Sequence, residues 1–302
     1  MAVTCILNGA AGSCEVEEAS QALGRVFTER GTAVRIVLPK PGDDLTALAR
    51  QAVQEQAPLL VVGGGDGTIG SVAGALVGSG TVLGVLPLGT LNHFARDLGI
   101  PLDLDGALET LLNGTVRRVD VGEVNGRVFL NNSGLGLYPH LVRERQAQQG
   151  RGWSKWPAFL YGLWAVFWRH RRLRLRLQWD GGDAVACRTP FAFVGNNAYV
   201  VEGLDMGRRL RLDAGRLCVY TAHQAGRREL VRLVVQALLG RLPPGALDTM
   251  EVAELRIQAR KRKLNVSTDG EVHRMTTPLQ YRIVPAALQV MAPASAPTTS
   301  LD

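Results

Sequence analysis

The chain has 302 residues, of which 46% are hydrophobic and 20% are charged, and its formal net charge is +7. This composition is typical of a globular protein with a sizeable core, and it excludes a largely disordered chain. The positive charge favours an anionic partner, such as a nucleotide, a nucleic acid or an anionic membrane, without choosing among them. Four scattered cysteines fit no zinc site, so we expect reduced thiols in a cytoplasmic protein.

The first part of the chain alternates short apolar runs with stretches of helical spacing. We expect four strands and three helices here, the strands at 3–7, 33–38, 59–62 and 82–86 and the helices at 15–30, 44–55 and 69–77. Asp44 is the candidate N-cap of the second helix. Strands that alternate with helices at this interval predict a mostly parallel sheet with helices on both faces. The N-terminus is typical of a first strand rather than of a signal peptide.

The pattern changes near residue 117, where short strands separated by Asn-Gly and Asp-Gly turns begin. We expect eight strands, at 118–124, 127–133, 173–179, 189–195, 216–221, 254–259, 264–268 and 279–283. They predict an antiparallel β domain, with helical inserts near 153–169 and 226–240. The chain is therefore divided into an α/β domain at 1–117, a β domain at 118–292 and a frayed tail at 293–302. We allow for the last strand returning to the first domain.

A glycine-rich loop, Gly63-Gly-Gly-Asp-Gly-Thr68, separates the third strand from the third helix. Glycines let the backbone approach an anion, and open α/β sheets bind ligands at the carboxyl ends of their strands. Asp66 fits such a site if a divalent cation lies between its carboxylate and the phosphates. Thr68 either donates its hydroxyl to a phosphate oxygen or caps the helix. The loop is neither a P-loop nor a GxGxxG turn, and a tight turn without a ligand is the alternative.

A second loop follows the fourth strand and begins at Pro87. Gly89 and Thr90 again place small residues at a strand end, and Asn92 can cap the helix that carries Phe94. Side by side, the two loops would form one cradle with several N–H donors. His93 either contacts a phosphate or lies at the rim of this cradle.

Both loops resemble the nucleotide motifs of the diacylglycerol kinase catalytic domain, a group that includes bacterial lipid kinases, sphingosine kinases and ceramide kinases. The resemblance covers nearly the whole chain, in order, through six segments: Val62-Gly-Gly-Gly-Asp-Gly-Thr68, Pro87-Leu-Gly-Thr-Leu-Asn-His-Phe-Ala-Arg96, Phe129-Leu-Asn-Asn-Ser-Gly-Leu-Gly136, Val194-Gly-Asn-Asn197, Asp213-Ala-Gly-Arg-Leu217 and Thr268-Asp-Gly-Glu271. It implies an α/β nucleotide domain, a C-terminal β-sandwich and a fold like that of NAD kinase and diacylglycerol kinase, with the active site in the cleft between the domains.

The resemblance also implies ATP and Mg²⁺ as cofactors and assigns their sites. The residues it places at the nucleotide are Asn8, Gly9, Ala10, Ala11, Gly12, Gly64, Gly65, Asp66, Gly67, Thr68, Ile69, Gly70, Ser71, Gly89, Thr90 and Asn92. Asp66 would meet the catalytic magnesium through water or phosphate. Glu271 would be the general base for the lipid hydroxyl, because a carboxylate at hydrogen-bond distance can take the proton during transfer. Asp269 is the rival base, or a residue that orients metal or water.

Three departures from the family pattern stand out. Ala214 replaces an Asp in a loop that holds a structural magnesium in bacterial diacylglycerol kinases, so a metal site at Asp213 is in doubt. Gly70 and Ser71 replace an Asn-Glu pair, and His93 replaces an Asp. Asp66, Thr90 and Glu271 are all present, so we expect an active kinase.

The segment from Trp153 to Arg172 contains four of the five tryptophans and ends in a basic cluster. Aromatic residues beside basic ones fit an interfacial helix on anionic lipid, and a helix packed on the β domain is the alternative. The runs 208–211 and 260–263 add further positive charge, for phosphate, for lipid headgroups or without a ligand. No run reaches the roughly 18 apolar residues that span a bilayer.

We therefore expect an ATP-dependent lipid kinase in the cytoplasm, peripherally associated with an anionic membrane. A diacylglycerol-like acceptor is favoured, and a homodimer through the β domain is expected as an option. The alternatives are a soluble small-molecule kinase of the NAD kinase type and a non-catalytic nucleotide- or lipid-binding module. A nucleic-acid partner is not expected, because the basic clusters are dispersed and no recognised nucleic-acid-binding motif is present.

Overall fold

The computed structural model describes residues 2–9, 14–136, 172–200, 207–222, 229, 232–233, 235–236, 243 and 245–294. The chain forms two compact units. The first consists of Met1–Val121, Arg211–Ala214 and Val284–Asp302, and the second of Gly122–Leu210 and Gly215–Ile283. The expected boundary near residue 118 falls within β5 (Thr115–Val124), whose last three residues belong to the second unit.

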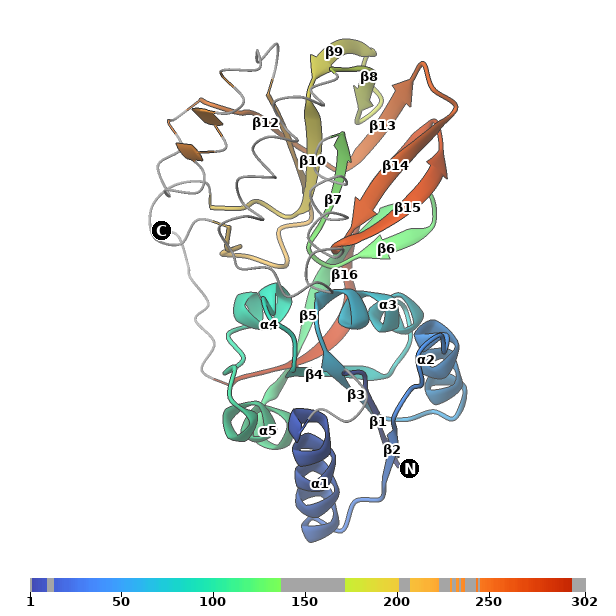
Figure 1. Ribbon diagram of the computed structural model, residues 1–302, viewed down its shortest axis with the longest axis vertical. Coiled ribbons are helices and arrows are strands. Elements are labelled where there is room, and N and C mark those ends of the chain that lie inside the picture. The colour runs from blue at the N-terminus through green and yellow to red at the C-terminus, as the bar shows by residue number, and fades with distance from the viewer. Residues whose placement is uncertain are drawn as a thin grey trace. The chain divides into compact units, whose positions relative to one another are not determined.

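The first unit is built on a parallel sheet with the strand order β2-β1-β3-β4-β16. Its strands are β1 (Val3–Leu7), β2 (Val34–Val37), β3 (Leu59–Gly64), β4 (Val82–Pro87) and the later part of β16 (Leu279–Ala292). All residues of β1 and β3 are buried, as in a sheet covered on both faces. Figure 1 shows α1 and α5 on one side of this sheet and α2 and α3 on the other. The predicted α/β fold is confirmed.

The helices of this unit are α1 (Cys14–Glu29), α2 (Leu45–Gln54), α3 (Asp66–Leu76), α4 (His93–Leu98) and α5 (Leu104–Asn113). Asp44 caps α2 as predicted, and its side chain accepts from the amides of Thr46 and Ala47. Two predictions were incomplete. Helix α3 begins at Asp66 rather than at Ile69, so the Asp-Gly-Thr sequence forms its first turn. Helix α5, capped by Asp103, was missed.

The second unit contains two antiparallel sheets. One has the order β9-β8-β13-β16, with β5 pairing with β16 and β6, and the other has the order β12-β11-β10-β7-β14-β15. The new strands are β6 (Arg127–Phe129), β7 (Asn132–Gly136), β8 (Leu173–Trp179), β9 (Val185–Thr189), β10 (Phe191–Asn196), β11 (Leu217–Thr221), β12 (Asp248–Val252), β13 (Glu254–Ala259), β14 (Lys263–Thr268) and β15 (Glu271–Thr276). The predicted antiparallel β domain is confirmed.

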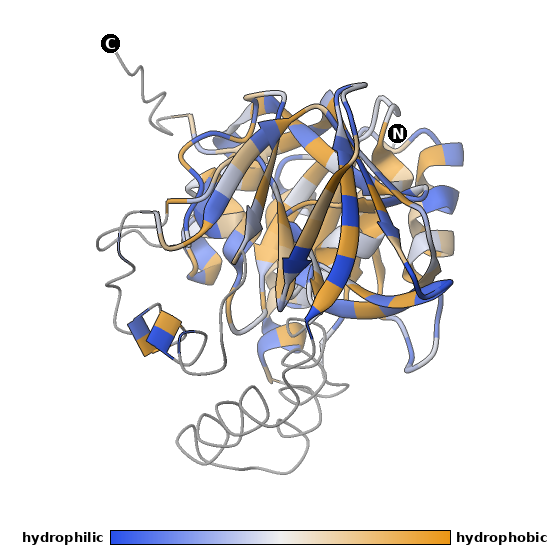
Figure 2. Cartoon of the chain, turned by 90° about the horizontal axis from the view of Figure 1, so that it is seen from above, coloured by the Kyte–Doolittle hydropathy of each residue, from blue (hydrophilic) through white to orange (hydrophobic). Residues whose placement is uncertain are grey.

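The core of the second unit lies between its two sheets. Leu175 and Ile257 come from one sheet, and Val194 and Val219 come from the other. Figure 2 shows hydrophilic and hydrophobic residues alternating along the strands, as expected when only one face of each sheet is buried.

Several predicted strands have different limits for identifiable reasons. The predicted strand at 127–133 is two strands, because the amides of Leu130 and Asn131 donate to the Asp269 carboxylate. The predicted strand at 189–195 is also two, which meet at Pro190, a residue without an N–H. Strands β12 and β15 were missed. Strand β16 continues past residue 283, the end that was predicted for it. In this continuation, Ala286 takes a positive φ of 49° and donates its amide to the Asp120 carboxylate.

The insert predicted at 153–169 lies outside the described residues. Of the insert predicted at 226–240, only residues 229, 232–233 and 235–236 are described, and they are helical. Within the described part of the chain, no helix combines the length and the apolar character needed to cross a bilayer.

Candidate functional site

The two glycine loops lie side by side at one edge of the parallel sheet. Strand pairing aligns Leu7 with Gly63 and Gly64 with Pro87, so β1, β3 and β4 end at the same level. A Cβ atom added to Gly89 would lie 2.5 Å from the Cα of Gly65. Because this distance is below van der Waals contact, only glycine fits at Gly89, and the two loops meet as the sequence predicts.

The end of β1 is tied to the first turn of α3. The Asn8 side-chain amide donates to the Thr68 hydroxyl oxygen over 3.0 Å. A hydroxyl has one proton to give and two lone pairs, so Thr68 keeps its proton for another acceptor. Asn8 and Thr68, both predicted at the nucleotide, therefore belong to one hydrogen-bonded group.

Asp66 links the two loops. Its carboxylate accepts from the backbone amides of His93 over 3.1 Å and of Phe94 over 3.0 Å. These are the first two residues of α4, so a side chain from the first turn of α3 satisfies amides that a helix start leaves unpaired. A carboxylate oxygen has two lone pairs, so it can accept a hydrogen bond and meet a cation at the same time.

Asn92 has a different role from the one predicted. It does not cap α4 with its side chain. Its side chain folds back, accepts from the Gly89 amide and donates to the carbonyl oxygens of Pro87 and Gly89. Asn92 is buried and takes a positive φ of 51°, which asparagine tolerates better than most residues. It thus fixes the shape of the second loop, while Asp66 caps the helix.

The other residues predicted at the nucleotide differ in exposure. Gly9 and Thr90 are exposed, and so is His93. Ile69 and Gly70 are buried within α3. The half-buried ones are Gly65, Gly67 and Ser71, while Gly64 is buried at the end of β3. Ala10, Ala11 and Gly12 lie outside the described residues.

Acidic side chains available for a metal are few. Within the described ranges, no three His, Cys, Asp or Glu side chains gather into a group that could hold a metal ion. Magnesium in kinases is usually bound by one or two carboxylates together with the substrate phosphates. The single carboxylate of Asp66 is enough for that pattern. Asp213 is exposed and accepts from the Arg211 guanidinium over 3.1 Å.

In the second unit, Asp269 occupies the turn between β14 and β15. Its carboxylate accepts from three backbone amides, those of Leu130 over 2.7 Å, Asn131 over 2.8 Å and Asn132 over 3.1 Å. Burial raises the pKa of this carboxyl to about 6, against the lowering effects of the three amides and of the Arg209 charge. With its oxygens occupied in this way, Asp269 anchors the turn to residues 130–132, which lead into β7.

Glu271 is the first residue of β15 and faces Thr268 across the hairpin. Its side chain is 44% exposed, and one carboxylate oxygen lies 3.5 Å from Nε2 of His273. The hairpin thus carries two carboxylates with different surroundings. The Asp269 carboxylate accepts from backbone amides, whereas the Glu271 carboxylate is open to an incoming group.

Arg209 is a structural residue that sequence reasoning missed. It was interpreted as one of the charges of the basic run 208–211, for phosphate, for lipid headgroups or without a ligand, but it is 2% exposed. Its guanidinium donates to the carbonyl oxygens of Leu130 and Asn196 and to the Asn131 side chain, and it lies over the Tyr199 ring. Its apolar neighbour Leu210 is instead 56% exposed. The pattern of apolar residues therefore gave no sign that Arg209 points inward.

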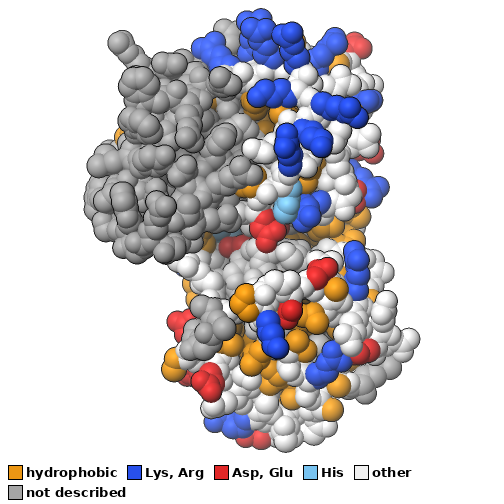
Figure 3. Space-filling view, turned by 45° about the vertical axis from the view of Figure 1, so that its right-hand side comes forward, with side chains coloured by type: hydrophobic (Ala, Val, Ile, Leu, Met, Phe, Trp, Pro, Cys, Tyr) orange, Lys and Arg blue, Asp and Glu red, His pale blue; other side chains and the backbone are white. Residues whose placement is uncertain are grey.

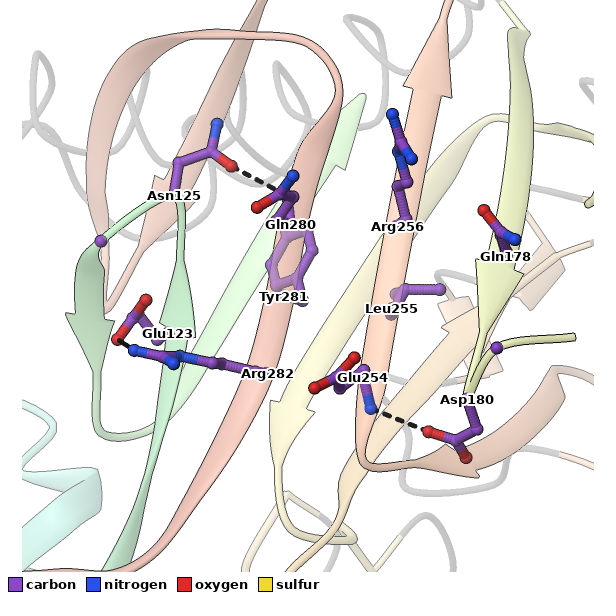
Figure 4. Close-up of a pocket in the computed structure, with 12 residues that line it drawn as sticks. Glu123, Asn125, Gln178, Asp180, Glu254, Leu255, Arg256, Gln280, Tyr281 and Arg282 are labelled. Atoms are coloured by element: carbon purple, nitrogen blue, oxygen red, sulfur yellow. Dashed lines mark hydrogen bonds and ion pairs between the residues drawn. The ribbon is translucent and has the colours of Figure 1, made fainter.

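A cavity of about 680 Å³ lies elsewhere in the second unit, and none of the predicted site residues lines it. Figure 4 shows that the charged and amide groups on its walls largely bind one another: Glu123 pairs with Arg282, Asn125 with Gln280, and Asp180 with the Glu254 amide. Arg256 stands between Gln280 and Gln178, and no dashed line reaches it.

A Gly89→Ala substitution tests the close contact of the two loops. The new Cβ would meet the backbone of Gly65, which cannot rotate away, so we expect a loss of about 1–3 kcal/mol of stability and weaker nucleotide binding. Gly24→Ala is the matched control, because a Cβ there meets nothing within 4 Å inside α1 and should stabilise slightly. Thermal denaturation and nucleotide titration of both variants check this. Equal behaviour of the two variants would contradict the contact.

Two family models match the chain. The diacylglycerol kinase catalytic domain matches residues 2–124, and the YegS C-terminal NAD kinase beta sandwich-like domain matches residues 143–292. A protein of Chromohalobacter salexigens named "Probable lipid kinase YegS-like" is 28% identical over 88% of this chain and 85% of its own length. A diacylglycerol kinase of Bacillus subtilis is 44% identical, over 33% of this chain and about a third (34%) of that protein.

A crystal structure of a diacylglycerol kinase from Bacillus anthracis has the same fold. Its TM-score is 0.70 at 20% identity, and the match covers 96% of both chains. The yeast NADH kinase shares the fold more distantly, with a TM-score of 0.55 at 12% identity over 96% of this chain and 82% of that one. Together, the two family models account for both units, and the chain belongs to the family of the diacylglycerol kinase catalytic domain.

Proposed function

We propose that this protein is an ATP-dependent lipid kinase that transfers the γ-phosphoryl group to a hydroxyl of a diacylglycerol-like lipid at a membrane surface. The observation that carries the proposal is the Asp66 carboxylate, which holds the start of α4 beside two touching glycine loops. The names of the relatives, a lipid kinase and a diacylglycerol kinase, support the lipid as the acceptor.

The nucleotide side of the reaction falls to the first unit. Backbone N–H groups of the Gly65–Thr68 turn bind phosphate oxygens, which its glycines allow to approach closely, while the Gly89 amide donates to Asn92 and shapes the second loop. The Thr68 hydroxyl, already held by Asn8, donates its proton to one of them. Bound Mg²⁺ would neutralise charge on the transferred phosphoryl group, and Asp66 is the residue that would hold it.

The acceptor side falls to Glu271. Its exposed carboxylate accepts the proton of the lipid hydroxyl while the hydroxyl oxygen forms its new bond to phosphorus, and ADP leaves with the electron pair of the broken bond. Asp269 positions the turn through its three amide contacts. Catalysis then comes mainly from positioning and from neutralising charge.

The decisive experiment measures phosphate transfer from labelled ATP, with Mg²⁺, to a panel of lipids in mixed micelles. The panel contains a diacylglycerol, a monoacylglycerol, a sphingoid base and an isoprenoid alcohol, with NAD as a soluble acceptor. Label in a lipid, lost in the Asp66→Ala and Glu271→Ala variants, would support the proposal and name the acceptor. Label in NAD alone would make the protein a small-molecule kinase, and ATP binding without any transfer would make it a binding module.

A further inference from the structure

The outer face of one sheet in the second unit carries a cluster of unpaired arginines. Side chains alternate between the two faces of a strand, so Leu175, Cys187 and Ile257 point to the core. Their neighbours on the opposite face are exposed, and four of them, called here the arginine face, are Arg174 and Arg176 on β8, Arg188 on β9 and Arg256 on β13.

Strand register brings these charges together. Arg174 lies directly opposite Arg188 in the β8–β9 pair, an arrangement of like charges that weakens a sheet. Within the described residues, none of the four arginines forms an ion pair or a side-chain hydrogen bond. An external anion bound at this pair would relieve the repulsion.

A second group of basic side chains adjoins this face. Ala259 of β13 pairs with Leu175, so the turn that follows begins beside Arg174. That turn is formed by the exposed residues Arg260, Lys261 and Arg262, and the exposed Lys263 begins β14 directly after it. Figure 3 shows Lys and Arg side chains gathered over the upper part of the molecule, in the second unit, with few acidic ones among them.

The acidic groups of the same sheet lie toward its other end, where Glu254, two residues from Arg256 on β13, is exposed and where Asp180 and Glu123 are engaged. Asp180 accepts from the amides of Ala253 and Glu254, and Glu123 pairs with Arg282. Arg174, Arg188 and the turn at 260–263 therefore gather at the end of the sheet where β8 begins, while Arg256 lies toward its other end, opposite Gln178. In the sequence, β8 follows directly after the tryptophan-rich segment that ends at Arg172.

We propose that the arginine face, together with the turn at 260–263, docks on an anionic phospholipid surface. The proposal rests on the proposed lipid kinase function for the choice of a membrane. Arginine suits this role, because its guanidinium forms bidentate contacts with phosphate groups. A nucleic acid is disfavoured, since the other outward residues of these strands include Gln178, Ala186 and Gln258 but no aromatic ring on which bases could stack.

The test is co-sedimentation with vesicles of phosphatidylcholine alone and with phosphatidylglycerol added. Wild type is compared with a triple variant, Arg174→Gln, Arg188→Gln and Arg256→Gln. The control triple variant, Arg50→Gln, Arg118→Gln and Arg127→Gln, removes three exposed arginines from other elements and changes the net charge equally. We expect the arginine-face variant to bind phosphatidylglycerol vesicles on the order of 100-fold more weakly at low salt, and the control to bind nearly as wild type.

Three outcomes would overturn the proposal. Wild type shows no preference for phosphatidylglycerol vesicles, or both triple variants lose vesicle binding equally, or the arginine-face variant loses only the binding of a nucleic-acid oligomer. Misfolding is excluded by the thermal midpoint of the arginine-face variant, which should equal or exceed that of wild type once the Arg174–Arg188 repulsion is removed. Transfer to a short-chain, water-dispersed diacylglycerol should persist in this variant. If wild type phosphorylates no lipid at all, the proposed function fails, while vesicle binding still decides the docking surface.

Discussion

An Asp66→Ala variant should lose phosphoryl transfer almost completely, with kcat/KM lower by about 1,000-fold or more. The carboxylate holds two amides at the start of α4 and is the one candidate ligand of magnesium in the glycine loops. Under the proposed function, its removal would disturb the second loop and leave the phosphate charge without a protein-bound cation. Kinases depend chiefly on positioning and charge neutralisation, so both losses act on the transition state. Steady-state transfer kinetics with varied Mg²⁺ measure the effect.

Asp44→Ala is the matched control for this variant. Asp44 also accepts from two amides at a helix start, those of Thr46 and Ala47, but it caps α2 and lies outside the glycine loops. Each variant should lose about 1 kcal/mol of stability from the missing cap. Only Asp66→Ala should lose transfer per folded molecule. Similar kinetics in the two variants would reduce Asp66 to a capping residue and remove its role beside the phosphates.

The position of the two glycine loops was predictable from the sequence because it depends on strand order alone. Parallel strands that alternate with helices place the carboxyl ends of β3 and β4 at one edge, whatever the side chains around them. The partners within the loops were not predictable. Whether Asn92 or Asp66 caps α4 depends on a loop fold in which Asn92 takes a positive φ, and a local cap signal does not reveal that.

The same limit applies to the second unit. The hairpin turn at Asp269 and Gly270 was predicted from the Asp-Gly pair, which suits the positive φ values of 46° and 85° that both residues take. The contacts that give Asp269 its role come from residues more than 130 positions away. Arg209 likewise became a core residue only through the carbonyl oxygens of Leu130, 79 positions away, and of Asn196, 13 positions away. Sequence patterns report local periodicity, and these contacts are not local.

The raised pKa of Asp269 predicts a pH dependence of stability. Because the pKa of Asp269 rises from 3.8 to about 6 on folding, the folded state binds its proton more tightly than the unfolded state does. Its contribution to stability is therefore greatest below pH 4, falls as the pH rises to about 6, and is constant above. The change amounts to at most about 3 kcal/mol. Urea denaturation between pH 4 and pH 7 should show this slope in wild type, and Asp269→Asn should lack it.

Glu271→Gln should slow transfer by about 100- to 10,000-fold while leaving ATP binding nearly unchanged, because glutamine keeps the shape of the side chain but cannot accept the hydroxyl proton. Asp269→Asn should instead act first on stability, since its amide nitrogen would face backbone N–H groups that now donate to a carboxylate. Glu251→Gln, which changes an exposed carboxylate on β12, is the control and should leave both properties as in wild type.

Single-turnover transfer rates and thermal midpoints of the three variants separate these roles. A folded Asp269→Asn enzyme without transfer, beside an active Glu271→Gln enzyme, would make Asp269 the base. The opposite pattern would establish that Glu271 takes the proton and that Asp269 holds the turn in place.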